Sequence, residues 1–274
     1  MWSAERRLRP LRSWLVPAAC CALLQVTGIA GVASQERAIA LEKLQSGRVF
    51  QSEEVRALQA DDFANPGMLW VEKGEKLWNE TAGADKRSCA TCHADASVSM
   101  KGAATRYPQM DGASGRLLNL EGRMQQCRVE RQKAPPFRYG ADELLSVSAY
   151  VSHQSRGQPV KVDIEGGAKK HFDAGRAFYY ERRGQMNLSC AHCHEANQGR
   201  TLFAEKISQG HSVAYPIYRL EWQSAGSLQR RMRSCLSGVR AELLPYGAQQ
   251  YLDLELFLAW RAQGLPFEAP GVRR

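Results

Sequence analysis

The stretch that decides the fold is Ser88-Cys89-Ala90-Thr91-Cys92-His93, which recurs as Ser189-Cys190-Ala191-His192-Cys193-His194. Each copy has two cysteines separated by two residues and a histidine directly after the second. In an exported protein this spacing is typical of haem c attachment, in which both thiols add to the haem vinyl groups and the histidine binds the iron. A redox Cys-x-x-Cys or a metal knuckle is the alternative for one copy. Two copies make that alternative negligible and predict two covalently bound haem c groups.

The first 33 residues have the features of a secretory signal peptide. A stretch with four arginines, at positions 6 to 12, precedes an apolar run from Ser13 to Ala33. Gly31 and Ala33 form a small-x-small cleavage site. A retained amino-terminal anchor is the alternative. Because haem c is attached after export of the unfolded chain, we expect the signal to be removed and the mature protein to be periplasmic.

Composition limits the classes of function. The 274 residues suffice for two ordinary domains. Residues 1–33 carry four arginines and one glutamate, so their removal lowers the formal charge from +9 to +6. A modestly basic protein suits an anionic substrate or an acidic partner, and the charge is too weak a signal for nucleic acid. Of the eight cysteines, six remain after removal, and Cys127 and Cys235 are the two outside the motifs.

The haem motif is part of a longer internal repeat. An offset of 101 residues carries Gly74 and Trp78 onto Gly175 and Tyr179, and the first motif onto the second. Beyond the motif the offset becomes 108 and then 107. It relates three segments of the two copies, namely Tyr107-Pro108 to Tyr215-Pro216, Arg123-Met124 and Cys127 to Arg231-Met232 and Cys235, and Tyr139-Gly140-Ala141 to Tyr246-Gly247-Ala248. The second copy therefore holds about seven extra residues after its motif, in a segment that includes Gly210 and His211.

The repeat predicts an all-α fold with two cytochrome c-like domains. We place the amino-terminal domain at residues 34–157, a linker at 158–170 and the carboxy-terminal domain at 171–274. Residues 68–80 should form an amphipathic helix in which Gly74 permits close helix approach. Each domain should end on a helix with one apolar face, formed by Leu144, Val147 and Val151 in the first and by Leu254, Phe257 and Leu258 in the second. The polar segment 34–66 suggests no chemistry, and His192 occupies a variable position of its motif.

The sixth iron ligand can be methionine or cysteine. Small cytochromes c commonly use methionine, and the chain offers Met100, Met110, Met124, Met186 and Met232. Cys127 and Cys235 recur with the repeat, and a thiolate is the stronger ligand for ferric iron. A buried inert cysteine, or a disulfide between these two, is the alternative. We predict Cys127 and Cys235 as the distal ligands. Because an anionic thiolate stabilises ferric iron and lowers the reduction potential, sulfur chemistry is favoured over simple electron transfer.

Three segments resemble SoxA, the larger cytochrome subunit of the bacterial SoxAX L-cysteine S-thiosulfotransferase. They are residues 208–223, residues 227–235 and residues 251–264. The resemblance spans essentially the whole mature chain. It implies that Cys89, Cys92, His93 and Cys127 serve one haem c, and that Cys190, Cys193, His194 and Cys235 serve the active-site haem. It further implies a persulfide on Cys235 and binding of the anionic substrate by Arg231. The family often has histidine where Gln229 stands and proline near Leu243, so this chain departs from the pattern there.

The resemblance implies an oxidative conjugation. Thiosulfate is joined to a cysteine thiol of the carrier protein SoxYZ, and two electrons pass to a small cytochrome c, the partner subunit SoxX. A planar arginine suits a sulfur oxyanion. For Arg230, Arg233 and Arg240, solvation or haem propionate pairing is expected more than direct catalysis. Two other functions remain open from the residues alone, an electron-transfer dihaem cytochrome c and a dihaem peroxidase.

Overall fold

The computed structural model describes residues 37–274, so the predicted signal peptide, residues 1–33, lies outside the described part. Arg37–Arg274 form one compact unit. Its helices are η1 (Leu41–Lys43), η2 (Gly47–Phe50), α1 (Glu53–Ala60), α2 (Met68–Asn79), α3 (Cys89–His93), α4 (Ala96–Ser99), η3 (Ala104–Arg106), α5 (Leu120–Arg131), α6 (Asp142–His153), η4 (Gly166–Ala168), α7 (Lys169–Tyr180), α8 (Cys190–His194), α9 (Leu228–Gly238) and α10 (Gln249–Arg261). Its strands are β1 (Gln109–Met110), β2 (Leu117–Leu118), β3 (Thr201–Leu202), β4 (Glu205–Lys206), β5 (Ile217–Arg219), β6 (Ser224–Gly226) and β7 (Gly271–Arg273).

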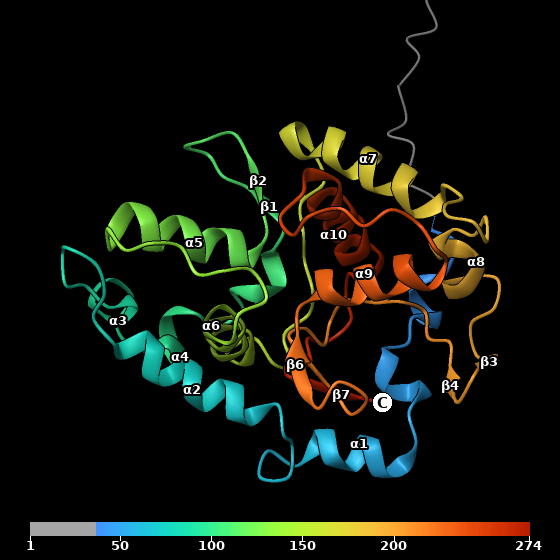
Figure 1. Cartoon of the computed structure of the whole chain (residues 1–274), viewed down its shortest axis with the longest axis horizontal. Coiled ribbons are helices and arrows are strands. Elements are labelled where there is room, and N and C mark those ends of the chain that lie inside the picture. Colours follow the sequence, from blue (N-terminus) through green and yellow to red (C-terminus); the bar gives the residue numbers. More distant parts are fainter. Residues whose placement is uncertain (1–36) are drawn as a thin grey trace, which may run out of the picture. The chain divides into compact units, whose positions relative to one another are not determined.

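Two close helix pairs organise the chain, α2 with α6 and α7 with α10 (Figure 1). At Gly74 in α2, a Cβ atom would lie 2.0 Å from the backbone oxygen of Ser146 in α6. At Gly175 in α7, the same atom would lie 2.0 Å from the backbone oxygen of Asp253 in α10. Only glycine permits backbones to approach this closely. The predicted helix at residues 68–80 and the role of Gly74 are therefore confirmed.

The predicted apolar faces of the closing helices are buried. Leu144, Val147 and Val151 on α6 are at most 4% exposed, and their counterparts Leu254, Phe257 and Leu258 on α10 are at most 7% exposed. The second half has an aromatic core in which Phe172 lies 5.6 Å from Phe257 and 5.0 Å from Trp260, measured between ring centroids. Burial of such side chains is the main stabilising contribution to each pair.

Short strands accompany the helices, so the predicted all-α class is not confirmed in its strict form. β1 pairs with β2 and β5 pairs with β6, both antiparallel, in the loop-rich middle of each half. β7 then adds to β5 in parallel, with Arg219 opposite Arg273. Strands of two or three residues carry too little alternation to be seen in a sequence.

The segments expected to be a lead-in and a linker are both packed. α1 and η2 contact β7, and the Gln59 side chain of α1 accepts a hydrogen bond from the Val272 backbone nitrogen at 3.0 Å. Between the two helix pairs, Val160 and Val162 are buried, and the Val160 nitrogen donates to the Leu265 oxygen at 3.0 Å. Backbone bonding of this kind positions both segments against the second half. The domain boundaries at 157 and 171 stay a prediction.

In residues 37–274, no helix has both the length and the apolar character that crossing a membrane requires.

Candidate active site and haem-binding residues

The second haem motif forms the single helical turn α8, which begins at a serine cap. The Ser189 backbone nitrogen and hydroxyl both lie within hydrogen-bond distance of His192 Nδ1, at 3.2 Å and 2.6 Å. His192 therefore stabilises the start of the turn, consistent with its expected place outside the iron ligands. Cys190 and Cys193 are three residues apart on this turn and face the same side. Both are free thiols, as are Cys89 and Cys92 of the first motif.

His194 is held in one orientation by the segment that follows it. Its Nδ1 lies 2.8 Å from the backbone oxygen of Ser208. This contact fixes the proton on Nδ1, so the lone pair of Nε2 is free to bind a metal. A Cβ atom at Gly210 would lie 2.7 Å from the ring. Burial lowers the pKa of His194 to about 4, so the imidazole is neutral. A neutral imidazole whose second nitrogen is bound to a carbonyl is the usual arrangement of an iron-binding histidine.

The first motif has a different environment. α3 begins at a capping box between Ser88 and Thr91, and the exposed His93 ring lies 5.7 Å from the Trp78 ring. In the described part of the chain, no hydrogen bond orients the His93 imidazole in the way that Ser208 orients His194. The segment after the second motif, in which the sequence predicted an insertion, thus supplies contacts for which the first half has no counterpart.

α9 brings Cys235 to the second motif. Ser227 caps the helix by accepting a hydrogen bond from the Arg230 nitrogen. Met232 and Leu236 lie four residues apart and are buried, so Arg231 and Cys235, also four apart, share a more open face. Burial, and then the neighbouring Cys235 side chain, raise the pKa of Cys190 to about 11 and also raise that of Cys193. The three cysteines are therefore neighbours.

The corresponding side chains of the first half also come together. Burial first, and then the neighbouring Cys127 side chain, raise the pKa of Cys89. Cys127 on α5 in turn lies within the electrostatic reach of Arg123 and Cys92. Met124 and Cys89 pack against the same buried cluster, which includes Trp78. The Met124 sulfur accepts a hydrogen bond from the Ser148 hydroxyl at 3.5 Å. The two thiols Cys127 and Cys235 are both free and do not form the alternative disulfide.

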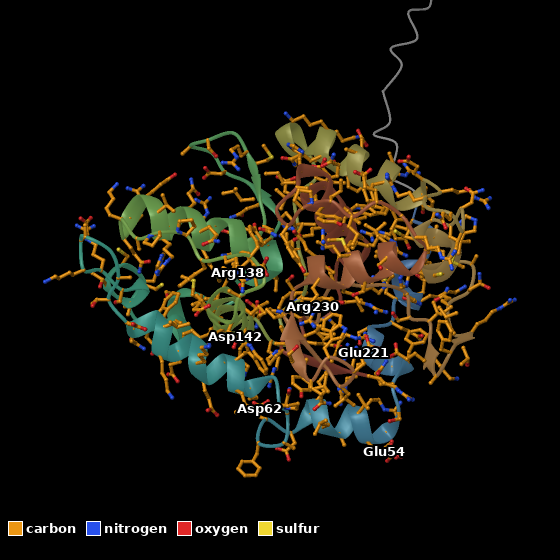
Figure 2. The ribbon with its side chains drawn as sticks, viewed as in Figure 1. Glu54, Asp62, Arg138, Asp142, Glu221 and Arg230 are labelled. Carbon is orange, nitrogen blue, oxygen red and sulfur yellow. The ribbon has the colours of Figure 1, made fainter. Side chains whose placement is uncertain are left out.

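Arg231 differs from the arginines around it. Arg230 on α9 donates to the Ser224 hydroxyl and lies over the ring of Trp222, in the β5–β6 hairpin. Figure 2 labels Arg230 and also Glu221, the hairpin residue that precedes Trp222. Arg233 donates to the Leu244 oxygen, and Arg240 to Gln185. Among residues 37–274, the Arg231 guanidinium has no hydrogen-bond or ion-pair partner. Burial lowers its pKa, but the neighbouring Cys235 and Tyr215 side chains, and then Glu205 and Glu221, raise it above the usual value. Of the arginines on α9, Arg231 is therefore the one whose side-chain donors are available to a ligand.

Tyr215 is a site residue that sequence reasoning used only as a marker of the repeat. Its side chain faces both Arg231 and Cys235, and burial raises the pKa of its hydroxyl, which therefore stays protonated and able to donate. The proline that follows it, Pro216, is in the cis form, as is Pro108 after Tyr107. The signal that could have found Tyr215 was its place in the repeat beside the predicted arginine.

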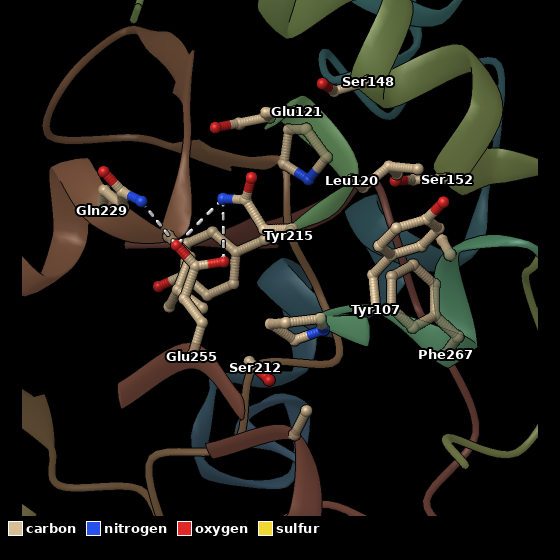
Figure 3. A pocket seen from close by; sticks show the side chains of 16 residues that line it. Tyr107, Leu120, Glu121, Ser148, Ser152, Ser212, Tyr215, Gln229, Glu255 and Phe267 are labelled. Atoms are coloured by element: carbon tan, nitrogen blue, oxygen red, sulfur yellow. Dashed lines mark hydrogen bonds between the residues drawn. The ribbon is translucent and has the colours of Figure 1, made fainter. Parts of the chain in front are cut away.

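A pocket of about 90 Å³ lies between the two halves. Figure 3 shows Gln229 joined to Glu255 by a hydrogen bond, with Glu121 set apart from them. Asn119 also donates to both Glu255 oxygens, at 3.1 Å each. Burial raises the pKa of Glu255 to about 7, and burial together with the charge of Glu255 raises that of Glu121 to about 8. Two carboxyl groups thus share one poorly solvated space.

The donor set of each half fits a covalently bound haem. In each half, two thiols one helical turn apart lie near a thiol on a second helix, and the motif histidine ends the same turn as the two thiols. In the second half, the buried Tyr179 hydroxyl and Arg183 Nε have no hydrogen-bond partner among residues 37–274, and both groups lie close to Cys190. Buried polar groups are rarely left unpaired in a complete protein, so these two atoms suit a polar prosthetic group.

The sequence and the fold are similar to those of known cytochrome c proteins. A sequence profile of the SoxA/TsdA cytochrome c domain matches residues 73–160. The L-cysteine S-thiosulfotransferase subunit SoxA of Pseudaminobacter salicylatoxidans is 40% identical over 230 residues, which cover 84% of this chain and 80% of that protein. The protein of the same name from Rhodovulum sulfidophilum is 34% identical over 232 residues, covering 85% and 81%. The crystal structure of SoxXA from P. pantotrophus matches with a TM-score of 0.82 and 35% sequence identity, over 84% of this chain and 87% of that one.

Proposed function

Because the chain belongs to the SoxA family, we propose that it is the catalytic subunit of an L-cysteine S-thiosulfotransferase that conjugates thiosulfate to a cysteine thiol of the carrier SoxYZ. The observation that carries the proposal is the Arg231 guanidinium beside Cys235 and Tyr215, which has no hydrogen-bond or ion-pair partner within the described residues 37–274. A cytochrome c domain implies haem c, and we place two, one on each Cys-x-x-Cys-His motif. The proposed iron ligands are His93 with Cys127, and His194 with Cys235.

The proposed arrangement also includes an internal repeat, an export signal and partners. The order α2, α3, α5, α6 is followed by α7, α8, α9, α10, which supports two related cytochrome c-like domains. Export of residues 34–274 to the periplasm is proposed from the sequence of residues 1–33. The similar SoxXA structure supports a small SoxX subunit as the partner. A cytochrome c as the electron acceptor is proposed from the sequence resemblance alone.

The reaction joins two sulfur atoms. One S–S bond forms between thiosulfate and the carrier cysteine, the carrier thiol loses its proton, and two electrons leave the sulfur pair. When bound, haem supplies the redox centre that accepts electrons. The chain's own residues bind and orient the substrate: Arg231 offers paired N–H donors to the sulfur oxyanion, and the neutral Tyr215 hydroxyl donates beside it. Cys235 is placed to accept or hold sulfur as a persulfide.

The test exchanges Arg231 for glutamine in the holoprotein. Loss of a charged donor to an anion costs about 1.5–3 kcal/mol, so Arg231→Gln should lower kcat/KM for thiosulfate by about 100-fold. The assay measures reduction of a cytochrome c with thiosulfate and a carrier thiol. Arg176→Gln removes one exposed positive charge on α7 and should leave turnover unchanged. Full activity of Arg231→Gln with both haems bound would contradict the proposal.

The state of Cys235 is tested separately. Mass analysis of the peptide that contains Cys235 should show one added sulfur, and the same analysis of the peptide that contains Cys127 should show none. An unmodified Cys235 in active protein would show that the persulfide is not required.

A further inference from the structure

The two arginines that recur with the repeat have opposite environments. In the first half, Arg123 donates to the Asp111 carboxylate at 2.7 Å and to Gln126 at 2.7 Å. In the second half, residues 37–274 offer the equivalent Arg231 no such carboxylate. Both arginines lie on the helix that carries the recurring cysteine, and both lie beside the tyrosine of a Tyr-Pro pair, Tyr107 or Tyr215. Each half therefore has an arginine at the corresponding position, but only the arginine of the first half is bound to a carboxylate of the protein.

The difference comes from a single position of the repeat. The offset of 108 that relates Arg123 to Arg231 also relates Asp111 to Arg219. Both residues lie at the end of a corresponding strand: Asp111 comes directly after β1, and Arg219 is the last residue of β5. β1 pairs antiparallel with β2, and β5 pairs antiparallel with β6. A carboxylate thus stands in the first half where a guanidinium stands in the second.

Asp111 is built to stay charged and in place. The Ser114 hydroxyl donates to it at 2.6 Å, the Ser114 nitrogen at 3.0 Å and the Gln126 amide at 3.3 Å. Its side chain is 6% exposed, against 30% for that of Arg123. The Ser114 and Arg123 hydrogen bonds hold the pKa of Asp111 far below its usual range. The carboxylate therefore occupies the donors of Arg123 as a small anion would.

Two carboxylates form ion pairs with Arg219, and neither is hydrogen-bonded to Arg231. The Arg219 side chain is 5% exposed and pairs with Glu205 at 2.9 Å and with Glu221 at 3.1 Å. Glu205 lies on β4, within the segment in which the second copy has its extra residues. Glu205 and Glu221 carry two negative charges against the one positive charge of Arg219, and both also lie within electrostatic reach of Arg231. Neither of them accepts a hydrogen bond from Arg231, so its guanidinium keeps its donors for an external anion.

We propose that the residue pair Asp111 and Arg219 determines which half of the molecule accepts the sulfur oxyanion. The Asp111 carboxylate takes the place of the substrate anion at Arg123 and so prevents anion binding in the first half. Arg219 at the corresponding position cannot bind Arg231 in this way, so the second half can bind the anion. This inference rests on the proposed function, because it takes Arg231 as the substrate-binding group.

The test measures thiosulfate binding to the holoprotein by titration calorimetry. Arg231→Gln should remove binding in the second half. Adding Asp111→Asn keeps an acceptor for Ser114 but removes the negative charge beside Arg123, so a dianion can displace the weaker neutral acceptor. The double variant should therefore bind one equivalent of thiosulfate, at least tenfold more tightly than Arg231→Gln alone. A further exchange, Arg123→Gln, should abolish that binding again. Asp111→Ser in the Arg231→Gln background is the second variant, and circular dichroism checks that each variant is folded.

The outcomes separate the two proposals. If wild-type protein binds thiosulfate and Arg231→Gln does not weaken it, the proposed function fails. If the folded Asp111→Asn and Asp111→Ser variants bind no thiosulfate in the Arg231→Gln background, the inference about Asp111 is overturned, whatever the result for Arg231. Binding that persists after Arg123→Gln would overturn it as well, because the new anion would then not be held by the freed arginine.

Discussion

At the scale of single residues, small differences between matched positions separate the two haem motifs. His194 is fixed by the Ser208 oxygen and covered by Gly210, whereas His93 is exposed beside Trp78. A histidine whose far nitrogen is bound to a carbonyl is oriented before the iron arrives and becomes a stronger ligand. The second motif is therefore the one whose geometry is most tightly prescribed by the protein, as a reacting centre requires.

Replacement of Gly210 by alanine tests this orientation. The added Cβ would lie 2.7 Å from the His194 ring, so Gly210→Ala should move the imidazole. Turnover should fall by about tenfold and the ferric low-spin resonance of one haem should change. Gly199→Ala is the matched control, because both glycines have a positive φ, 74° and 79°, but nothing lies within 4 Å of a Cβ at Gly199. Equal effects of both substitutions would assign them to backbone strain alone.

At the scale of helices and strands, the chain could be predicted where its signals are local. The haem motifs, the helix at 68–80 and the buried faces of α6 and α10 follow from spacing and period within a few turns. Partners distant in sequence could not be predicted in this way. The hydrogen bonds between Gln59 and Val272, the pairing of β5 with β7, and the burial of Val160 depend on contacts that no local pattern records.

The contact between α2 and α6 predicts a strong effect at Gly74. A Cβ atom there would meet the Ser146 backbone oxygen at 2.0 Å, and backbone cannot move aside as a side chain can. Gly74→Ala should therefore lower the free energy of unfolding by about 3 kcal/mol or more, measured by denaturant titration of the holoprotein. Gly238→Ala, in α9 with nothing within 4 Å, should be neutral or stabilise by up to about 1 kcal/mol. Similar stabilities of the two variants would contradict the close packing.

At the scale of the whole molecule, the two halves meet around polar groups as well as apolar ones. The pocket between them contains Glu121 and Glu255, and the rings of Tyr139 and Tyr246 stack nearby with centroids 6.3 Å apart. None of this could be predicted from the sequence, in which Glu255 is one polar residue within an apolar helix. The sequence repeat drew attention to Arg231 and Cys235, and their roles stay a prediction. The pairing of Asp111 with Arg123, by contrast, is visible only in three dimensions.

The buried carboxyl groups make stability depend on pH. The folded-state pKa of Glu255 is about 7, above the usual 4.5, so the folded protein binds more protons than the unfolded chain between these values. Stability should therefore fall as pH rises from about 5 to about 8, by at most about 3 kcal/mol for this group. Glu255→Gln should reduce the fall, measured as thermal midpoints at both pH values.

The control for this prediction is Glu72→Gln, an exposed position on α2, which should leave the pH dependence unchanged. A wild-type protein that is as stable at pH 8 as at pH 5 would show that the carboxyl groups are solvated in the complete molecule.

The parallel pairing of β7 with β5 has a practical consequence for anyone preparing this protein. Residues 271–273, near the end of the sequence, form β7 and pair with β5, so that Arg273 lies opposite Arg219. An affinity tag joined directly after Arg274 would pull on that strand and disturb the charge balance near Arg231. A spacer between the two, or removal of the tag before spectroscopy, keeps the measurement on the undisturbed centre.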